Sequence, residues 1–226
     1  MLAASQSDTT KAQAALEKLC RTYWYPLYAY VRRRGHPAQD AEDLTQAFFA
    51  RLLERHWVDD ADHERGRFRT FLLTAMSRFL SDEWDKARAQ KRGGGVTHVP
   101  IQLDAAETRY GHEPVDNCTP EQSYERRWAL TLLDTVLQRL RAEYEHAGKS
   151  ELFAALNSSL VGGRESQPYA ELATQVDMNE GAVKVAVHRL RQRYRKLLRA
   201  EIAETMAATE DVDQELRQLF AVLAGS

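Results

Sequence analysis

Apolar residues recur every three or four positions along most of the chain, which is the spacing of an amphipathic helix. In the first half of the sequence this pattern predicts helices over residues 14–31, 38–55 and 68–92. Pro26 interrupts the first of these, which leaves either two helices or one kinked helix. The Gly-His-Pro triplet at residues 35–37 predicts a turn between the first helix and the second.

The second half of the chain shows the same spacing. It predicts four further helices, over residues 120–144, 152–160, 168–176 and 180–202. The first of these opens with Thr-Pro-Glu-Gln at residues 119–122, where the threonine can cap the helix and the glutamine can bond back to it. Because helical spacing dominates throughout, we expect an all-α protein.

Residues 93–118 separate the two halves and carry six glycines and prolines without sustained periodicity. Such a stretch is long for a compact domain, which indicates a linker. We expect two helical domains joined by a long irregular linker. The expected boundaries are a first domain over 14–92, the linker over 93–123, a second domain over 124–202 and an acidic tail over 203–226.

The tail carries a helical apolar stripe. The stripe comprises Val212, Leu216, Leu219, Phe220 and Leu223. It can pack back on the second domain or engage a partner, and docking on the protein itself is the favoured interpretation.

Composition excludes several classes of protein. The 226 residues include 43% hydrophobic side chains and two cysteines, which is ordinary globular usage and too few thiols for a disulfide scaffold or a four-thiolate zinc site. No zinc-type His and Cys spacing, phosphate-cradling glycine loop or nucleophile–base pair occurs, so we expect no metal, no cofactor and no catalytic residue. With no apolar run of about 20 residues and no secretory leader, we expect a cytoplasmic protein without a membrane segment.

Charge is segregated along the chain although the net charge is only −2. Residues 65–92 hold eight bases and three acids, and residues 184–199 hold seven bases and no acid. Residues 39–64, 101–125 and 201–226 are acidic. Two basic blocks on one chain indicate two contacts with a polyanion, whereas a single block would more simply be a solvated helix surface.

Residues 168–202 form the strongest single motif, which is typical of a helix-turn-helix. Asp177 can tolerate a left-handed backbone in the turn, and Asn179 can cap the second helix. Val183, Val187 and Leu190 would bury the inner face of the second helix. The side chains left to point outward are Glu180, Lys184, Val185, His188, Arg189 and Arg191. The alternative is a helical hairpin with a solvated basic face.

At this point the sequence resembles a known family. Residues 169–191 (YAELATQVDMNEGAVKVAVHRLR) are similar to the region-4 helix-turn-helix of bacterial RNA polymerase sigma factors of the extracytoplasmic-function (ECF) type, in the sigma-70 family. Residues 28–32 (YAYVR) and 40–49 (DAEDLTQAFF) resemble their regions 2.1 and 2.2, and residues 67–80 (RFRTFLLTAMSRFL) resemble region 2.3 running into 2.4. The segments stand in the family's order.

The resemblance implies three sets of functional residues. The acidic start of the second helix would bind the clamp helices of the polymerase's largest subunit through Asp40, Glu42, Asp43, Gln46 and Phe49. The third helix would hold the promoter −10 element as a single strand through Arg67, Arg69, Ser77, Arg78, Lys86, Arg88, Lys91 and Arg92. The last helix would read the −35 element through Lys184, Val185, His188, Arg189 and Arg191.

Some positions depart from the family pattern. Asp177 replaces the usual small residue of the region-4 turn, and Ala182 replaces a usual threonine. The loop over residues 58–66 is unusually acidic for the capture of a flipped base, so we assign no base contact to it. Phe68 and Phe71 share the inner stripe, which favours a core role over base stacking, and Trp84 fits either role.

The expected function is therefore a sigma factor without enzymatic activity, which directs core RNA polymerase to promoters for transcription initiation. Its expected partners are core polymerase and promoter DNA, with an anti-sigma factor left open. Two alternatives remain. One is a polymerase-independent helix-turn-helix regulator that binds duplex DNA, and the other is an inactive scaffold that binds polymerase without opening promoters.

Overall fold

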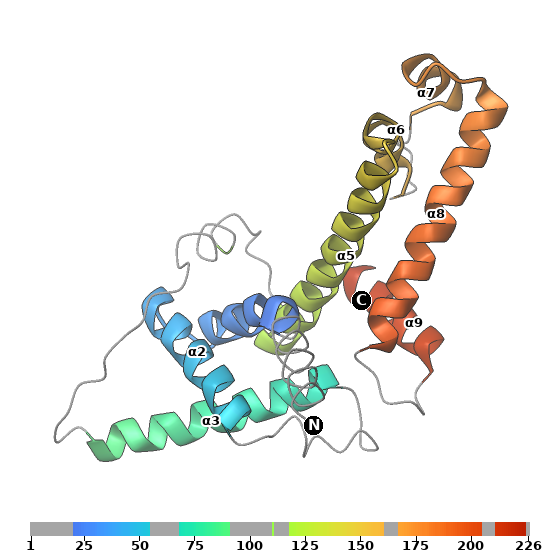
Figure 1. Cartoon of the computed structure of the whole chain (residues 1–226). Helices are drawn as coiled ribbons and strands as arrows, with labels where there is room; N and C mark the ends of the chain where they lie inside the picture. Colours follow the sequence, from blue (N-terminus) through green and yellow to red (C-terminus); the bar gives the residue numbers. More distant parts are fainter. Residues whose placement is uncertain are drawn as a thin grey trace, which may run out of the picture. The chain divides into compact units, whose positions relative to one another are not determined.

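A computed structural model describes residues 20–54, 68–90, 110, 118–160, 167–204 and 211–224 (Figure 1). All regular secondary structure within these residues is helical, which confirms the predicted all-α class. The chain divides into two compact units. The first combines the described residues up to Thr131 with the C-terminal helix, and the second spans Leu132–Glu204.

Five helical stretches longer than one residue lie among the described residues of the first unit. They are residues 20–33, α2 (Ala38–Glu54), α3 (Phe68–Gln90), the first three turns of α5 (Pro120–His146) and α9 (Val212–Ala224). The predicted helices over 38–55 and 68–92 are thus confirmed to within two residues. Pro26 is buried and lies inside residues 20–33, which are helical throughout.

The core of the first unit includes buried side chains from α2 and α3. α2 contributes Phe48 and Leu52, and α3 contributes Leu72 and Met76, all fully buried. The rings of Phe48 and Phe79 meet edge to face at 5.7 Å and join α2 to α3. An aromatic pair therefore takes part in the packing of these two helices.

Two local signals in the sequence set the ends of elements in this unit. Gly35 has φ +95° in the turn before α2, a backbone that glycine adopts without strain. At the start of α5, Thr119 Oγ1 accepts from the Gln122 backbone N at 3.2 Å, and Gln122 Oε1 accepts from the Thr119 backbone N at 2.9 Å. This reciprocal pair is the predicted capping box.

The second unit contains the rest of α5, α6 (Ser150–Leu156), η1 (Asn157–Leu160), α7 (Tyr169–Gln175) and α8 (Glu180–Ala203). Its core includes Val136 and Leu140 of α5 and Leu190 and Leu197 of α8. The helix that the sequence predicts over 152–160 begins two residues earlier, at Ser150, and changes from α to 3₁₀ geometry at Asn157.

Polar bonds fasten α8 to α5 within the second unit. Arg193 donates two hydrogen bonds to Glu143, from Nε at 2.7 Å and from Nη2 at 2.6 Å. Tyr194 donates from its hydroxyl to the Leu133 carbonyl at 3.4 Å. Donation from Arg193 lowers the pKa of the Glu143 carboxyl below its ordinary value, despite the opposing effect of burial.

Most of the expected linker lies outside the described residues. The acidic loop over residues 58–66 lies wholly outside them. Within the linker, Tyr110 and residues 118–123 are described. The ring of Tyr110 meets Tyr28 edge to face at 6.4 Å. It also lies under the guanidinium of Arg32 at 4.8 Å and that of Arg127 at 5.6 Å. Two cations and a buried ring thus hold this tyrosine against the first unit.

The tail forms the expected amphipathic helix, α9, and it docks on the protein itself. Its partner is the first unit, not the second domain that the sequence suggested. Leu219 is fully buried, whereas Phe220, from the same apolar stripe, is 54% exposed. The stripe is therefore only partly covered.

Candidate nucleic-acid interface

The helix-turn-helix forms as predicted. α7 and α8 meet at a tight turn in the second unit (Figure 1). Asp177 has φ +50°, the left-handed backbone expected of it, and the Met178 backbone N bonds to the Ala173 carbonyl at 3.0 Å. Asn179 caps α8, because its Oδ1 accepts from the Ala182 backbone N at 2.8 Å. Two backbone-directed signals therefore fix where the second helix begins.

The first turns of α8 separate an inner face from an outer face. Val183, Val187 and Leu190 are fully buried, as predicted. The outer face exposes four of the five residues expected at the −35 element, namely Lys184, Val185, His188 and Arg189. The structure therefore brings these four together on one accessible surface of one helix.

Lys184 carries an intrahelical ion pair that leaves it available. Its Nζ lies 2.9 Å from Glu180 Oε1, and both side chains are more than half exposed. An exposed pair four residues apart contributes only about 0.3–0.5 kcal/mol, so a phosphate or a base acceptor can replace the carboxylate. Val185 beside it is 49% exposed, and an exposed methyl pair suits contact with a thymine methyl group.

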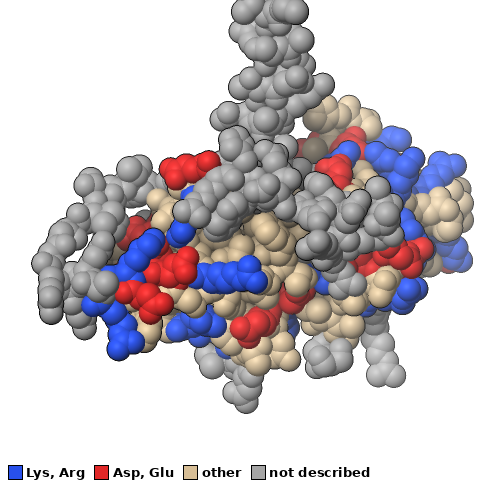
Figure 2. Space-filling model, turned by 90° about the horizontal axis from the view of Figure 1, so that it is seen from below, with Lys and Arg blue, Asp and Glu red and all other residues tan. Residues whose placement is uncertain are grey.

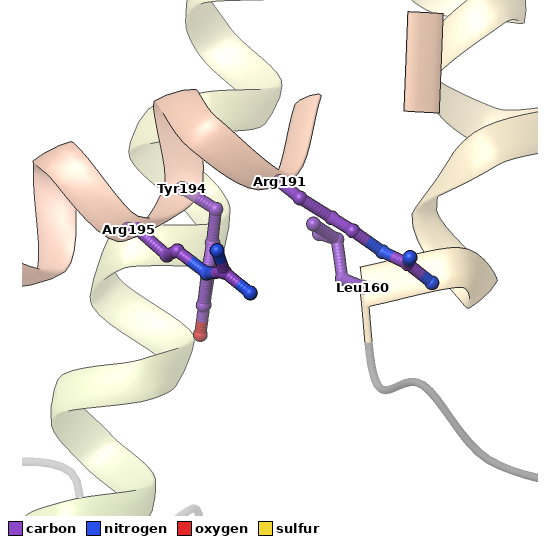
Figure 3. A pocket seen from close by; sticks show the side chains of 4 residues that line it. All are labelled: Leu160, Arg191, Tyr194 and Arg195. Carbon is purple, nitrogen blue, oxygen red and sulfur yellow. The ribbon is translucent and has the colours of Figure 1, made fainter. Parts of the chain in front are cut away.

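Arg191, the fifth residue of this set, is placed differently. It is half-buried, and its Nε and Nη2 both donate to the Ser159 carbonyl, at 2.9 and 2.7 Å. Together with Leu160, Tyr194 and Arg195 it lines a hollow of about 260 Å³ between α8 and η1 (Figure 3). The side chain therefore ties α8 to η1, and a phosphate contact suits it better than base readout.

The expected −10 residues of α3 are partly described. Arg78, Lys86 and Arg88 are exposed, and Ser77 is half-buried. Lys86 Nζ lies 2.6 Å from Glu83 Oε1 on the same helix. Arg67, Lys91 and Arg92 lie outside the described residues.

Trp84 is an aromatic residue whose role, core or base stacking, the sequence left open. Its side chain is 59% exposed, and the guanidinium of Arg88 stacks over its ring at 4.4 Å. An exposed ring with a cation on one face is the combination that single-stranded nucleic acid uses for stacking and backbone contact. Phe68 and Phe71, by contrast, are half-buried and stack on each other at 6.0 Å.

Arg69 departs from the expected DNA-facing set. Its side chain is buried, and it forms ion pairs with Glu125 of α5 and Glu215 of α9. A guanidinium enclosed in this way has no path to a DNA backbone in this arrangement. The signal for it was in the sequence, because position 69 precedes Leu72 and Met76 by three and seven residues and so shares their buried face.

The candidate polymerase-binding residues divide in the same way. Asp40, in the first turn of α2, is exposed, and Asp43 and Gln46 are half-buried. Glu42 and Phe49 are each 5% exposed, and Glu42 Oε1 accepts from Gln46 Nε2 at 3.2 Å. An accessible surface at this helix start therefore comes from Asp40, Asp43 and Gln46.

Charge on the described surface is mixed at close range. On the face shown in Figure 2, Lys and Arg atoms lie among Asp and Glu atoms and form no single basic field. In the part of the chain that the structure describes, no three His, Cys, Asp or Glu side chains gather as a metal site. No helix among the same residues is both long enough and apolar enough to span a bilayer.

Comparison with known proteins gives two matches. Residues 19–90 match sigma-70 region 2. The chain is 25% identical over 201 residues to the ECF RNA polymerase sigma factor SigE of Mycolicibacterium smegmatis, an alignment that covers 88% of this chain and 68% of that protein. No solved structure matches the chain.

Proposed function

The chain belongs to the sigma-70 family as an RNA polymerase sigma factor of the ECF type, and from this premise we propose that it directs core RNA polymerase to promoters and acts in transcription initiation. One observation carries the proposal. A sigma-70 region 2 over residues 19–90 is followed on the same chain by a capped helix-turn-helix whose second helix exposes Lys184, Val185, His188 and Arg189.

We assign the parts of the chain to the parts of initiation by the expected boundaries. Residues 14–92 would serve as region 2, residues 93–123 as the linker and residues 124–202 as region 4. No chemical step falls to the chain itself, since recognition and positioning are its whole task. A protein that works with core polymerase on the chromosome would act in the cytoplasm.

Core polymerase would bind the start of α2. Asp40 is exposed in the first turn, and Asp43 and Gln46 follow at half-exposed positions. Carboxylates here favour the helix start and also offer charge to a basic partner surface. Glu42 and Phe49, being buried, would support this surface from beneath.

The −10 strand would lie along α3. Arg78, Lys86 and Arg88 supply exposed cations for the backbone, and Ser77 supplies a hydroxyl. Arg67, Lys91 and Arg92 remain part of this proposed set. Trp84 joins it as a stacking surface with Arg88.

The −35 duplex would receive the N-terminal turns of α8 in its major groove. Lys184 and Arg189 would reach guanine acceptors or phosphates, and Val185 and His188 would line the same groove. Arg191 would hold a backbone phosphate from its position beside Ser159. An anti-sigma protein, where one exists, would have to cover one of these three surfaces.

The test is transcription reconstituted from the purified chain and core polymerase on fragments of the source organism's genome. Sequencing the 5′ ends of the transcripts should reveal shared sequence elements near −10 and −35 that core polymerase alone does not select. Transcription indistinguishable from that of core polymerase alone would overturn the proposal. Tight duplex binding by the chain without polymerase, in the same preparation, would instead support the helix-turn-helix regulator.

A further inference from the structure

Arg69 is held by α9, a helix that neither region 2 nor region 4 includes. Its Nη1 pairs with the Glu215 carboxylate, and its Nη2 donates to Gln218 Oε1 at 3.1 Å. Glu215 is itself 2% exposed. The two outer nitrogens of a guanidinium are the fork that binds phosphate or carboxylate, so α9 occupies the phosphate-binding end of this side chain.

The rest of Arg69 is positioned by α5 and does not depend on α9. Tyr124 donates from its hydroxyl to the Arg69 backbone carbonyl at 3.0 Å. The guanidinium lies 4.4 Å from the centre of the Trp128 ring, and its Nε lies 3.0 Å from Glu125 Oε2. If α9 left, Arg69 would keep its place at the first turn of α3 and present Nη1 and Nη2 outward.

The attachment of α9 rests on a small apolar contact. Leu219 is fully buried, but Phe220 is 54% exposed, and Val212, Leu216 and Leu223 are only half-buried. A buried ion pair adds little net stability, because the attraction is offset by the loss of hydration of both charges. Another anion that binds Nη1 and Nη2 of Arg69 can therefore displace the Glu215 carboxylate and, with it, α9.

We propose that α9 is an intramolecular competitor of single-stranded nucleic acid at the start of α3. In the free chain Glu215 and Gln218 bind the Arg69 guanidinium. A DNA phosphate that binds the same guanidinium displaces α9. The inference deepens the proposed function, on which it rests, by making access to one end of the −10 surface conditional on release of the C-terminal helix.

Competition has a reciprocal consequence that can be measured in the unaltered protein. If DNA and α9 exclude each other, DNA must loosen α9 by the same factor by which α9 weakens DNA binding. Hydrogen–deuterium exchange of residues 212–224 should accelerate several-fold when the full chain is saturated with a short single strand of mixed sequence. The peptide covering α6 (Ser150–Leu156) serves as internal control and should not change. Unchanged exchange in α9 at saturation would overturn the proposal.

A pair of matched variants tests the same point from the other side. Glu215→Gln with Gln218→Ala removes the two α9 contacts, whereas Asp213→Asn with Gln214→Ala makes the same chemical changes at exposed positions of α9. The first variant should bind the fluorescein-labelled strand a few-fold more tightly than wild type. Its plot of log K against log salt should steepen by about 0.7, the slope of one added phosphate contact on a single strand. The control variant should match wild type.

The outcomes distinguish failure of the competition at Arg69 from failure of the proposed −10 role of α3. Faster exchange in α9 of the first variant, with affinity and salt slope unchanged, would make Arg69 purely structural and overturn the competition. Adding Arg69→Gln to the first variant should return the slope to the wild-type value, and a slope that stays steep would also overturn it. Failure of every variant and of wild type to bind the strand, alone or with core polymerase, would overturn the proposed role of α3 itself.

Discussion

Arg193 of α8 and Glu143 of α5 form a two-bond fork, with donor–acceptor distances of 2.7 and 2.6 Å. The two residues are 50 positions apart in the sequence and join two helices. It predicts a dependence of stability on pH. The pKa of Glu143 lies below its ordinary value of 4.5, chiefly because Arg193 donates to the carboxylate. The contribution of this pair to the free energy of unfolding is therefore complete at pH values above that ordinary pKa. It is lost as pH falls through the pKa of Glu143 in the folded state.

Urea unfolding at several pH values checks this. Glu143→Gln should lower the unfolding free energy by about 0.2–1 kcal/mol near neutral pH, since both side chains are about 34–40% exposed and screened by solvent. The difference from wild type should shrink on acidification. Asp85→Asn, at an exposed acid away from the first turn of α3, is the control and should show neither effect. A difference that grows at low pH would contradict the assignment.

Asn179 fixes the start of the proposed recognition helix. Asn179→Ala should cost about 1 kcal/mol of stability, because the Ala182 backbone N loses its partner. Asn179→Asp should restore most of the loss. Thermal unfolding of the full chain measures both, and two variants of equal stability would show that the cap is not used in solution.

The outer face of α8 should carry the −35 sequence preference. Lys184→Ala or Arg189→Ala should weaken binding to the preferred site by about 1–3 kcal/mol if the side chain makes a two-bond base contact. Lys196→Ala, at an exposed cation two turns further along α8, should weaken binding to all duplexes alike. Fluorescence anisotropy on the preferred and a scrambled duplex separates these results. Equal weakening on both duplexes would assign Lys184 or Arg189 to phosphate.

The start of α2 should carry the affinity for core polymerase. Asp40→Lys with Asp43→Lys reverses charge at two accessible positions and should abolish co-purification with core polymerase. Nonspecific DNA binding by the free chain should not fall. Glu151→Lys, at an exposed acid in the first turn of α6, should behave as wild type. Retained assembly by the double variant would place the polymerase contact elsewhere.

Trp84 should stack on an unpaired base. Trp84→Ala should weaken binding of a single strand by about 1–3 kcal/mol, the range for base–aromatic stacking, and Trp84→Phe should retain much of it. Leu130→Ala, at another exposed apolar side chain of the first unit, should leave the affinity unchanged. Equal loss in the alanine and phenylalanine variants would favour a tryptophan-specific packing role.

Local features of this chain were predictable because neighbouring residues determine them. The start of α2 at Ala38, the capping box at Thr119, the left-handed Asp177 and the cap at Asn179 are all confirmed. Each depends on a hydrogen bond or a backbone angle within four residues. These local hydrogen bonds and backbone angles can be predicted without knowledge of the fold.

Pairings between distant residues were not predictable in this way. Arg69 and Glu215 are 146 residues apart, and each lies in a block of like charge, the first of which the sequence indicates as a polyanion contact. Charge counts treat every cation of a basic block alike, whereas the helix period buries some and exposes others. The family resemblance placed Glu42 and Phe49 in a contact surface residue by residue, although both are buried.

The alternation of Val183, Val185 and Val187 along α8 separates two requirements of the helix. Val183 and Val187 anchor it to the scaffold, while Val185 is free to meet a partner. Under the proposed role of α8, substitutions at Val185 would therefore alter which genes respond without displacing the helix. Selection would then retune the regulon through one valine while its buried neighbours keep the architecture constant.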